Sequence, residues 1–194
     1  MSYLDSTKQL FRYYKTLGEK AMHQLEPGQL FTSANEDTNS IAVIVKHLSG
    51  NMLSRWTDFL TSDGEKTWRD RDGEFEENPE LADAHQAKTD LLTAWEKGWT
   101  CLFDALDGLT DDQLDDIVYI RNEGHTVMEA INRQLAHYPY HIGQIVFYAK
   151  MLKNGAWESL SIPKNQSTDY NADKFSKDKT IGQFTDAELK KLKK

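Results

Sequence analysis

Apolar residues recur every three or four positions in four long stretches of the chain, which is the spacing of one face of an α-helix. These stretches predict helices at residues 3–25, 41–60, 81–106 and 127–152. The first is expected to stop before Pro27, because proline disfavours helical backbone in the residue that precedes it. Four amphipathic helices of this length bury their apolar faces best against one another. The pattern therefore predicts an all-α protein built as a four-helix bundle.

Polar residues punctuate this pattern. Thr110-Asp111-Asp112-Gln113 is a capping-box sequence that predicts a short helical turn, and Thr126-Val127-Met128-Glu129 is a second one that opens the fourth long helix. The second helix is expected to end near Asp63-Gly64 and the fourth near Asn154-Gly155, because glycine and asparagine favour turns.

The remaining segments carry weaker signals. The charged stretch 65–80 has no apolar stripe, and no convincing period-two alternation or internal repeat is present. From 158 to 179 the composition turns to Ser, Asn, Asp and Lys, which predicts an extended tail, while Thr185-Asp186-Ala187-Glu188 weakly predicts a last short helix. We therefore expect a helical bundle over 1–157 and a C-terminal tail over 158–194.

Composition narrows the class of protein. The chain has 194 residues, 39% hydrophobic and 28% charged, which is typical of one globular domain. A net charge of −8 argues against a nucleic-acid partner, which would need a clustered basic surface. Cys101 is the single cysteine, so an internal disulfide is excluded and a reducing compartment is favoured. No signal peptide is recognisable and no apolar run approaches the ~20 residues of a membrane span. These features predict a cytoplasmic protein with no membrane partner.

Two histidines of the fourth predicted helix have the spacing of metal ligands. His137 and His141 are separated by four positions, which places both rings on one face about one turn apart. On the helical wheel they flank the apolar stripe beside Gln134, where an unpaired imidazole would be costly. Taken alone, the pair fits either a metal site or two histidines satisfied by water and carbonyl groups.

Pro139 stands between the two histidines, inside the helix. It removes a backbone N–H and crowds the carbonyl of Leu135, so a kink is expected. A proline inside a helix costs about 3 kcal/mol. Two interpretations remain open: a helix shaped for its ligand pair, or a tolerated kink.

His47 on the second helix is the third candidate ligand. It flanks that helix's apolar stripe among small or polar residues, including Gly50 and Asn51, as expected beside a cavity. Three histidines leave coordination positions open for water or substrate, which favours a catalytic or ligand-binding metal over a closed structural one. Imidazole ligation suits Zn²⁺, Ni²⁺, Fe²⁺ or Cu²⁺ rather than Ca²⁺ or Mg²⁺. The other histidines, at 23, 85 and 125, are expected at surfaces or caps.

These motifs resemble a known superfamily. His47 within Val45-Lys46-His47-Leu48, together with the run from His137 to Gln144, looks like the DinB-like (YfiT-like) superfamily of bacterial four-helix proteins. More specific matches occur around Asn39-Ser40-Ile41, Asp63-Gly64-Glu65-Lys66, Trp68 to Asp72, Pro163 to Ser167, and Tyr170-Asn171. Together they resemble a branch classified only as a domain of unknown function.

The resemblance implies several further properties. It implies an up-down-down-up order of helices, a homodimer, and Zn²⁺ or Ni²⁺ bound by His47, His137 and His141. Some relatives are metal-dependent thiol transferases that use a small bacterial thiol such as bacillithiol, so a thiol S-transferase or a small-molecule hydrolase is one expectation. The alternative is a non-catalytic, stress-related protein that binds a metal or a small ligand. A third hypothesis is a dimerising interaction module with an inherited site.

Four residues near the predicted ligands are candidates for assisting them. Asn51 lies one turn after His47 and is placed to hydrogen-bond a metal-bound ligand, and Arg55 is placed to hold an anionic group. Tyr140 and Gln144 neighbour the pair on the fourth helix, where Gln144 is placed to orient an imidazole. Each also has a plain interpretation as a helix-surface side chain. The Arg69–Asp72 cluster is expected to be a salt-linked loop, with folding over the site as the alternative.

Overall fold

The computed structural model describes residues 2–76 and 82–192, and this part of the chain is mostly helical. Its elements in chain order are α1 (Tyr3–His23), η1 (Pro27–Phe31), α2 (Ile41–Trp56), η2 (Gly73–Phe75), α3 (Ala84–Asp107), η3 (Asp111–Asp115), β1 (Ile117–Ile120), β2 (Glu123–Thr126), α4 (Val127–Lys153), α5 (Ser167–Phe175) and α6 (Phe184–Leu192). The start of the third helix predicted at Leu81 lies outside the described residues.

Side-chain caps fix where the helices begin. The Ser40 hydroxyl accepts a hydrogen bond from the Val43 N–H at 3.2 Å, so α2 starts at Ile41. The Thr126 hydroxyl accepts from the Glu129 N–H at 3.1 Å, and Thr110 forms a capping box at η3. Both sequence-predicted helix starts are confirmed.

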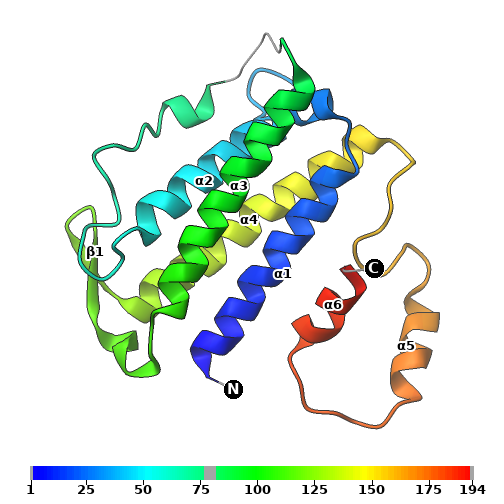
Figure 1. The fold of residues 1–194 in the computed structure, drawn as a ribbon. Helices are drawn as coiled ribbons and strands as arrows, with labels where there is room; N and C mark the ends of the chain where they lie inside the picture. The colour runs from blue at the N-terminus through cyan, green and yellow to red at the C-terminus, as the bar shows by residue number, and fades with distance from the viewer. Residues whose placement is uncertain (1, 77–81, 193–194) are drawn as a thin grey trace.

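The four long helices lie side by side (Figure 1). In that view α1 and α4 run upward, whereas α2 and α3 run downward. Helix α1 packs against α4 and α3, and α2 packs against α3 and α4, so the four apolar faces share one core. Since α2 and α3 run in the same direction, the connection between them must return along α2, and this brings η2 against that helix.

Large aromatic side chains fill the middle of the core. Phe11 of α1, Trp95 and Trp99 of α3, and Tyr138 of α4 are each at most 1% exposed. The ring of Phe11 lies 6.3 Å from that of Trp99 and 5.8 Å from that of Tyr138, in tilted or edge-on contact. Such pairs add about 0.5–1.5 kcal/mol beyond the area they bury. The core therefore holds α4 at Tyr138, which lies between its two metal-ligand candidates.

Helix α2 ends earlier than the apolar pattern predicts. It ends at Trp56, Thr57 is extended, and Asp58 adopts a left-handed φ of 50°. The apolar pattern continues because Phe59 folds back from the following turn and packs on Trp56, with ring centroids 4.7 Å apart. The sequence pattern therefore counted Phe59 as a helical position, although it makes its core contact from a turn.

A two-stranded antiparallel hairpin that the sequence pattern did not indicate precedes α4, within a structure that is otherwise helical as predicted. In β1, Val118 and Ile120 are each 3% exposed, while Ile117 and Tyr119 are more than half exposed. Burial alternates along the strand, but all four residues are apolar, so the sequence shows no alternation. The two-residue turn has positive φ at Arg121 and Asn122, as the primed hairpin turns require.

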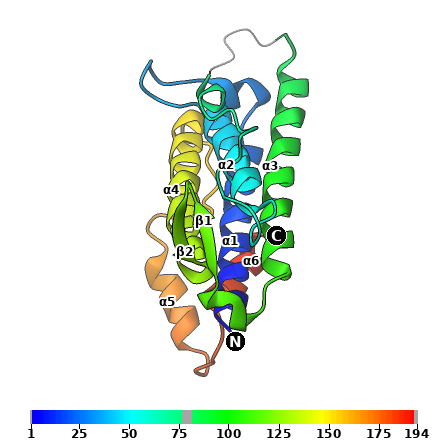
Figure 2. The ribbon, with the colours of Figure 1, turned by 90° about the vertical axis from the view of Figure 1, so that its left-hand side faces the viewer.

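The tip of this hairpin is tied to the segment that follows α2. The Asp63 carboxylate accepts hydrogen bonds from the N–H groups of Arg121 and Asn122, both at 2.9 Å, and the Gly64 N–H donates to the Tyr119 carbonyl at 2.8 Å. Burial raises the pKa of Asp63, but the backbone N–H donors lower it more, so the pKa lies below its ordinary value. Figure 2 shows the hairpin beside the start of α4. Arg121 is thereby held near the end of α2.

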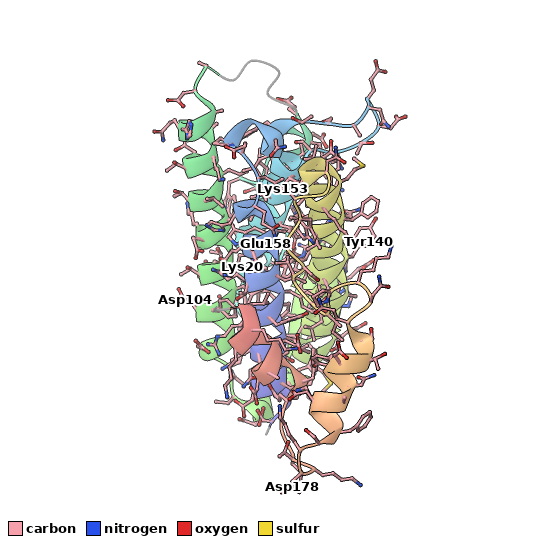
Figure 3. The ribbon with its side chains drawn as sticks, turned by 90° about the vertical axis from the view of Figure 1, so that its right-hand side faces the viewer. Lys20, Asp104, Tyr140, Lys153, Glu158 and Asp178 are labelled. Carbon is pink, nitrogen blue, oxygen red and sulfur yellow. The ribbon has the colours of Figure 1, made fainter. Side chains whose placement is uncertain are left out.

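The C-terminal segment contains two helices, where an extended tail and one short helix were predicted. Helix α5 lies inside the stretch predicted to be extended; none of its residues is buried, so it carries no apolar periodicity. Helix α6 packs on α1, where the Thr185 hydroxyl donates to the Gln9 side chain at 3.0 Å. Thr185 lies within α6 rather than capping it, although the predicted helix exists. Figure 3 shows both helices outside the long ones.

Within the described segments, no helix combines the length and apolarity needed to cross a membrane.

Candidate metal centre

Three histidines from two helices converge at one point. His47 lies on α2, and His137 and His141 lie on successive turns of α4. The Nε2 atom of His137 is 3.3 Å from that of His47 and 3.1 Å from that of His141. One ligand atom from each of the three residues lies within 4.8 Å of the others. The structure therefore brings together the three residues selected from the sequence.

These separations suit a single bound cation. A zinc–nitrogen distance of about 2.0–2.1 Å and tetrahedral angles place neighbouring ligand nitrogens about 3.3 Å apart. The two Nε2 separations at His137 are close to that value. The remaining pair of ligand atoms lies within 4.8 Å, so these two side chains would approach one another when a metal binds.

Glutamine side chains contact the two histidines of α4 at Nδ1, the ring nitrogen that faces away from the shared point. The Nδ1 atom of His137 lies 3.2 Å from Oε1 of Gln134, and Nδ1 of His141 lies 2.8 Å from Oε1 of Gln144. Each glutamine is three residues from its histidine, one turn along the same helix. An oxygen acceptor at Nδ1 places the ring proton there and leaves the Nε2 lone pair toward the shared point. The role expected for Gln144 matches this geometry.

A carboxylate performs the same task for His47. Oε2 of Glu74 in η2 lies 3.0 Å from Nδ1 of His47, and both side chains are less than 10% exposed. Arg69 holds this carboxylate with two hydrogen bonds, from Nε at 2.7 Å and from Nη2 at 2.8 Å. Burial raises the pKa of Glu74, but the hydrogen bonds from Arg69 and His47 lower it further, to a net value below its ordinary one. An ionised carboxylate therefore orients the imidazole, as carboxylates orient many metal-bound histidines.

Gly50 makes room for this carboxylate. A Cβ atom at position 50 would lie 2.0 Å from Oε1 of Glu74, a distance that no pair of nonbonded atoms tolerates. Glycine inside a helix costs roughly 0.5–1 kcal/mol relative to alanine. The glycine in α2 is therefore explained by the approach of Glu74 to His47.

Burial keeps the two imidazoles of α4 neutral. It lowers the pKa of His137 to about 3, with further lowering from His141 and His47. The pKa of His141 is also lowered, chiefly by burial, although its hydrogen bond to Gln144 opposes this. Neutral imidazole is the form that binds a metal, because the Nε2 lone pair is free. At neutral pH both imidazoles of α4 are therefore in the form that coordinates a metal.

The metal-free protein should lose stability as the pH falls from about 6.5 toward about 3. In this window His137 of the unfolded chain, with an ordinary pKa of 6.5, binds a proton that the folded chain excludes. The unfolded state then binds more protons, so the free energy of unfolding falls with falling pH. Urea titrations with a chelator present, at pH 7.5 and pH 5, measure the change. A His137→Asn variant should show a weaker pH dependence, and an equally steep one in both proteins would contradict the explanation.

An open cavity adjoins the histidines. Its volume is ≈ 270 Å³, and His47 and His137 form part of its wall. Its other lining residues are Asn51, Arg55, Arg69, Arg71, Arg121, Arg133 and Gln134. A ligand in this cavity would therefore lie next to two of the three imidazoles.

The other predicted assisting residues lie around the site in different ways. Asn51 lines the cavity, and its Oδ1 accepts from the buried Tyr138 hydroxyl at 3.0 Å. Arg55 also lines it, and its Nη1 donates to the Gly64 carbonyl. Tyr140 is 63% exposed and lies at the outer side of α4, with its ring 5.0 Å from that of His141 (Figure 3).

Sequence reasoning missed Glu74, Arg69 as its anchor, and the role of Gln134. Gln134 had a signal, because it stands one turn before His137 on the same face. Glu74 had none, because it lies inside the charged stretch 65–80, which has no apolar periodicity. The segment around Arg69 shows features of both predicted alternatives. Arg69 forms an ion pair with Glu74, as expected of a salt-linked loop. The Phe75 ring further along the segment lies 5.0 Å from the His47 ring, so the segment also lies beside the site.

The remaining histidines lie apart from the cluster. His23, at the end of α1, is exposed and its Nδ1 lies 2.7 Å from the Glu19 carbonyl. His85 is exposed in the first turn of α3, and His125 of β2 pairs with Glu129 at 3.4 Å.

Comparison with known proteins identifies one related group. A family model described as "Protein of unknown function (DUF1572)" matches residues 1–166, which include the four long helices and the three histidines. No curated protein and no solved structure matches the chain.

Proposed function

The chain belongs to the family described as Protein of unknown function (DUF1572), and we propose that it binds one divalent transition-metal ion through His47, His137 and His141. The observation that carries the proposal is the convergence of three Nε2 atoms, each on a ring whose Nδ1 faces an oxygen acceptor. Loading the purified chain with Zn²⁺ or Ni²⁺, followed by elemental analysis, tests it. About one ion per chain is expected, and near-zero metal would contradict the proposal.

The proposed class of ion, a divalent transition metal, rests on the chemistry of its ligands. Imidazole nitrogens favour borderline metals, and Zn²⁺ and Ni²⁺ are the ions that the family resemblance implies. Three protein ligands leave at least one coordination position free, which is the pattern of catalytic rather than structural zinc. Elemental analysis of protein purified without added metal distinguishes the two ions.

An enzymatic role is the second part of the proposal. A bound divalent ion lowers the pKa of a coordinated thiol or water and so supplies a nucleophile at neutral pH. The cavity beside His47 and His137 supports this role, because it would give a substrate access to an ion held by the three histidines. We propose a metal-dependent thiol S-transferase, with a small-molecule hydrolase as the related alternative. The chain's own part would be to hold the ion, orient the imidazoles and bind the substrate.

Thiol transfer should depend on the metal. Conjugation of bacillithiol to an electrophile is expected to stop when a chelator removes the ion and to resume when Zn²⁺ or Ni²⁺ is added back. Product formation followed by chromatography measures the rate. A rate unaffected by chelation would contradict the transferase. Stoichiometric metal without turnover of thiols or esters would instead support the non-catalytic binding protein.

The order of helices and the second copy complete the proposal. The directions of α1 to α4 support a DinB-like up-down-down-up bundle.

A homodimer is also proposed, and the exposed apolar residues Tyr140, Phe147 and Met151 give α4 a face that a second copy would cover. Light scattering should give the mass of two chains, and substitution of Phe147 by serine should shift it toward one. A mass of one chain at high concentration would contradict the dimer.

A further inference from the structure

The cavity beside the histidines concentrates positive charge in a protein that is negative overall. The whole chain carries a net charge of −8, yet five guanidinium groups line this single cavity: Arg55, Arg69, Arg71, Arg121 and Arg133. They come from four parts of the fold, namely α2, the segment before η2, the hairpin tip and α4. Such convergence requires an electrostatic explanation, because like charges repel one another.

Carboxylates offset only part of this charge. Glu74 takes both hydrogen bonds of Arg69, and Glu65 is shared by Arg55 at 3.3 Å and Arg121 at 3.0 Å. Among the described residues, these two glutamates are the carboxylates that form ion pairs with the five arginines, so the ion pairs offset two of the five positive charges. The Glu74 carboxylate also contacts Nδ1 of His47.

Two of the arginines are available to a ligand. Within residues 2–76 and 82–192, Arg71 and Arg133 have no carboxylate partner. Arg71 stacks over the Phe75 ring at 5.5 Å, which holds its planar group beside the cavity. Both side chains are exposed, so a small solute has access to them.

The buried arginine of the group also keeps an unsatisfied donor. The Arg55 side chain is only 6% exposed, and among the described residues its Nε has no hydrogen-bond partner. A buried N–H without an acceptor costs about 1–3 kcal/mol, and more for a charged group. Arg55 therefore sits in a wall that would be stabilised by further negative charge.

We propose that this cavity binds a small organic anion with at least two negative charges, whose carboxylate or phosphate oxygens are held by Arg71 and Arg133 next to the histidine cluster. Guanidinium groups suit both kinds of oxyanion because their parallel N–H groups match two oxygens at once. The volume of ≈ 270 Å³ lies near the lower limit for ligand pockets, so the ligand is a small molecule. The proposal rests on the proposed function only in naming the substrate class of the metal site; anion binding itself needs no metal.

Calorimetry with defined probes tests the proposal. Succinate and glycerol 3-phosphate each carry two negative charges, whereas succinamide and glycerol are their neutral counterparts. Both the Zn²⁺-loaded and the metal-free protein should bind at least one of the two anions and neither neutral compound. The affinity should fall as salt is raised, because these exposed charges are screened. Binding of succinate alone selects carboxylate ligands, and binding of glycerol 3-phosphate alone selects phosphate ligands.

Charge-removing variants locate the binding. Arg133→Gln and Arg71→Gln should each raise the Kd of the bound anion about tenfold, as loss of one charge-assisted hydrogen bond predicts. The matched control is Lys150→Gln, which removes an exposed positive charge from the same helix as Arg133 and should leave the Kd unchanged. An unchanged Kd in both arginine variants, or equal binding of the neutral compounds, would overturn the proposal.

These measurements distinguish failure of the metal-site proposal from failure of the anion-site proposal. Near-zero metal in the wild-type chain together with arginine-dependent anion binding would overturn the metal site and support the anion site. Stoichiometric metal without anion binding, in both the Zn²⁺-loaded and the metal-free protein, would support the metal site and overturn the anion site. Elemental analysis of each arginine variant separates loss of anion binding from loss of the ion.

Discussion

Replacement of His137 by alanine is expected to reduce the bound metal from about one ion per chain to near zero. His137 is the middle ligand, because its Nε2 lies within 3.3 Å of both other Nε2 atoms. Its loss leaves one imidazole on α2 and one on α4. Removing only the partner of a metal ligand weakens binding by about 10–100-fold, so removal of a ligand should weaken it by more. Elemental analysis after desalting measures the change.

The control for this variant is His23→Ala, which removes an exposed histidine near the end of α1. It should retain the metal of the wild type. Circular dichroism should show the same helical content for both variants, because His137 is only partly buried and its neighbours fill the core. Equal metal in His137→Ala and the wild type would show that the ion binds elsewhere.

Replacement of Gly50 by alanine should weaken metal binding about 10–100-fold without removing any ligand. The added Cβ would occupy the place of Oε1 of Glu74, so that carboxylate must move away from Nδ1 of His47. His47 then loses the group that fixes its ring. Competition with a fluorescent chelator measures the affinity of the variant.

The matched control is Gly143→Ala on α4. A Cβ at position 143 would meet no atom within 4 Å, although this glycine lies two residues from His141. Alanine should therefore leave metal affinity unchanged and raise the free energy of unfolding by up to about 1 kcal/mol, through its higher helix propensity. An affinity lowered equally in both variants would show that Gly50 acts through the helix backbone and not through Glu74.

The ligands could be predicted from the sequence because helical periodicity is a local property. The spacing of His137 and His141 decides that both rings share a face of α4, whatever surrounds that helix. His47 was found in the same way, from its position on the wheel of α2. Long helices and caps such as Thr126 also depend on a few neighbouring residues.

The groups that support the ligands depend on the path of the chain between helices. Glu74 reaches His47 only because the segment after α2 returns along that helix, and no periodic pattern marks such a path. The hairpin was hidden for another reason. Its outward residues Ile117 and Tyr119 are apolar, so alternation of burial leaves no trace in alternation of residue type. The arginines of the cavity are likewise scattered in sequence and meet only in the fold.

The packing of α1 against α4 has a consequence for synthesis of the chain. Helix α1 is complete at His23, but α4 begins only at Val127 and ends at Lys153. At about 5–20 residues per second, translation delivers this partner roughly 5 to 26 seconds after α1 has been made. Until then Phe11 and its apolar neighbours lack one side of their core. Until α4 emerges, α2 and α3 are the only other long helices in the described part of the bundle that have been made.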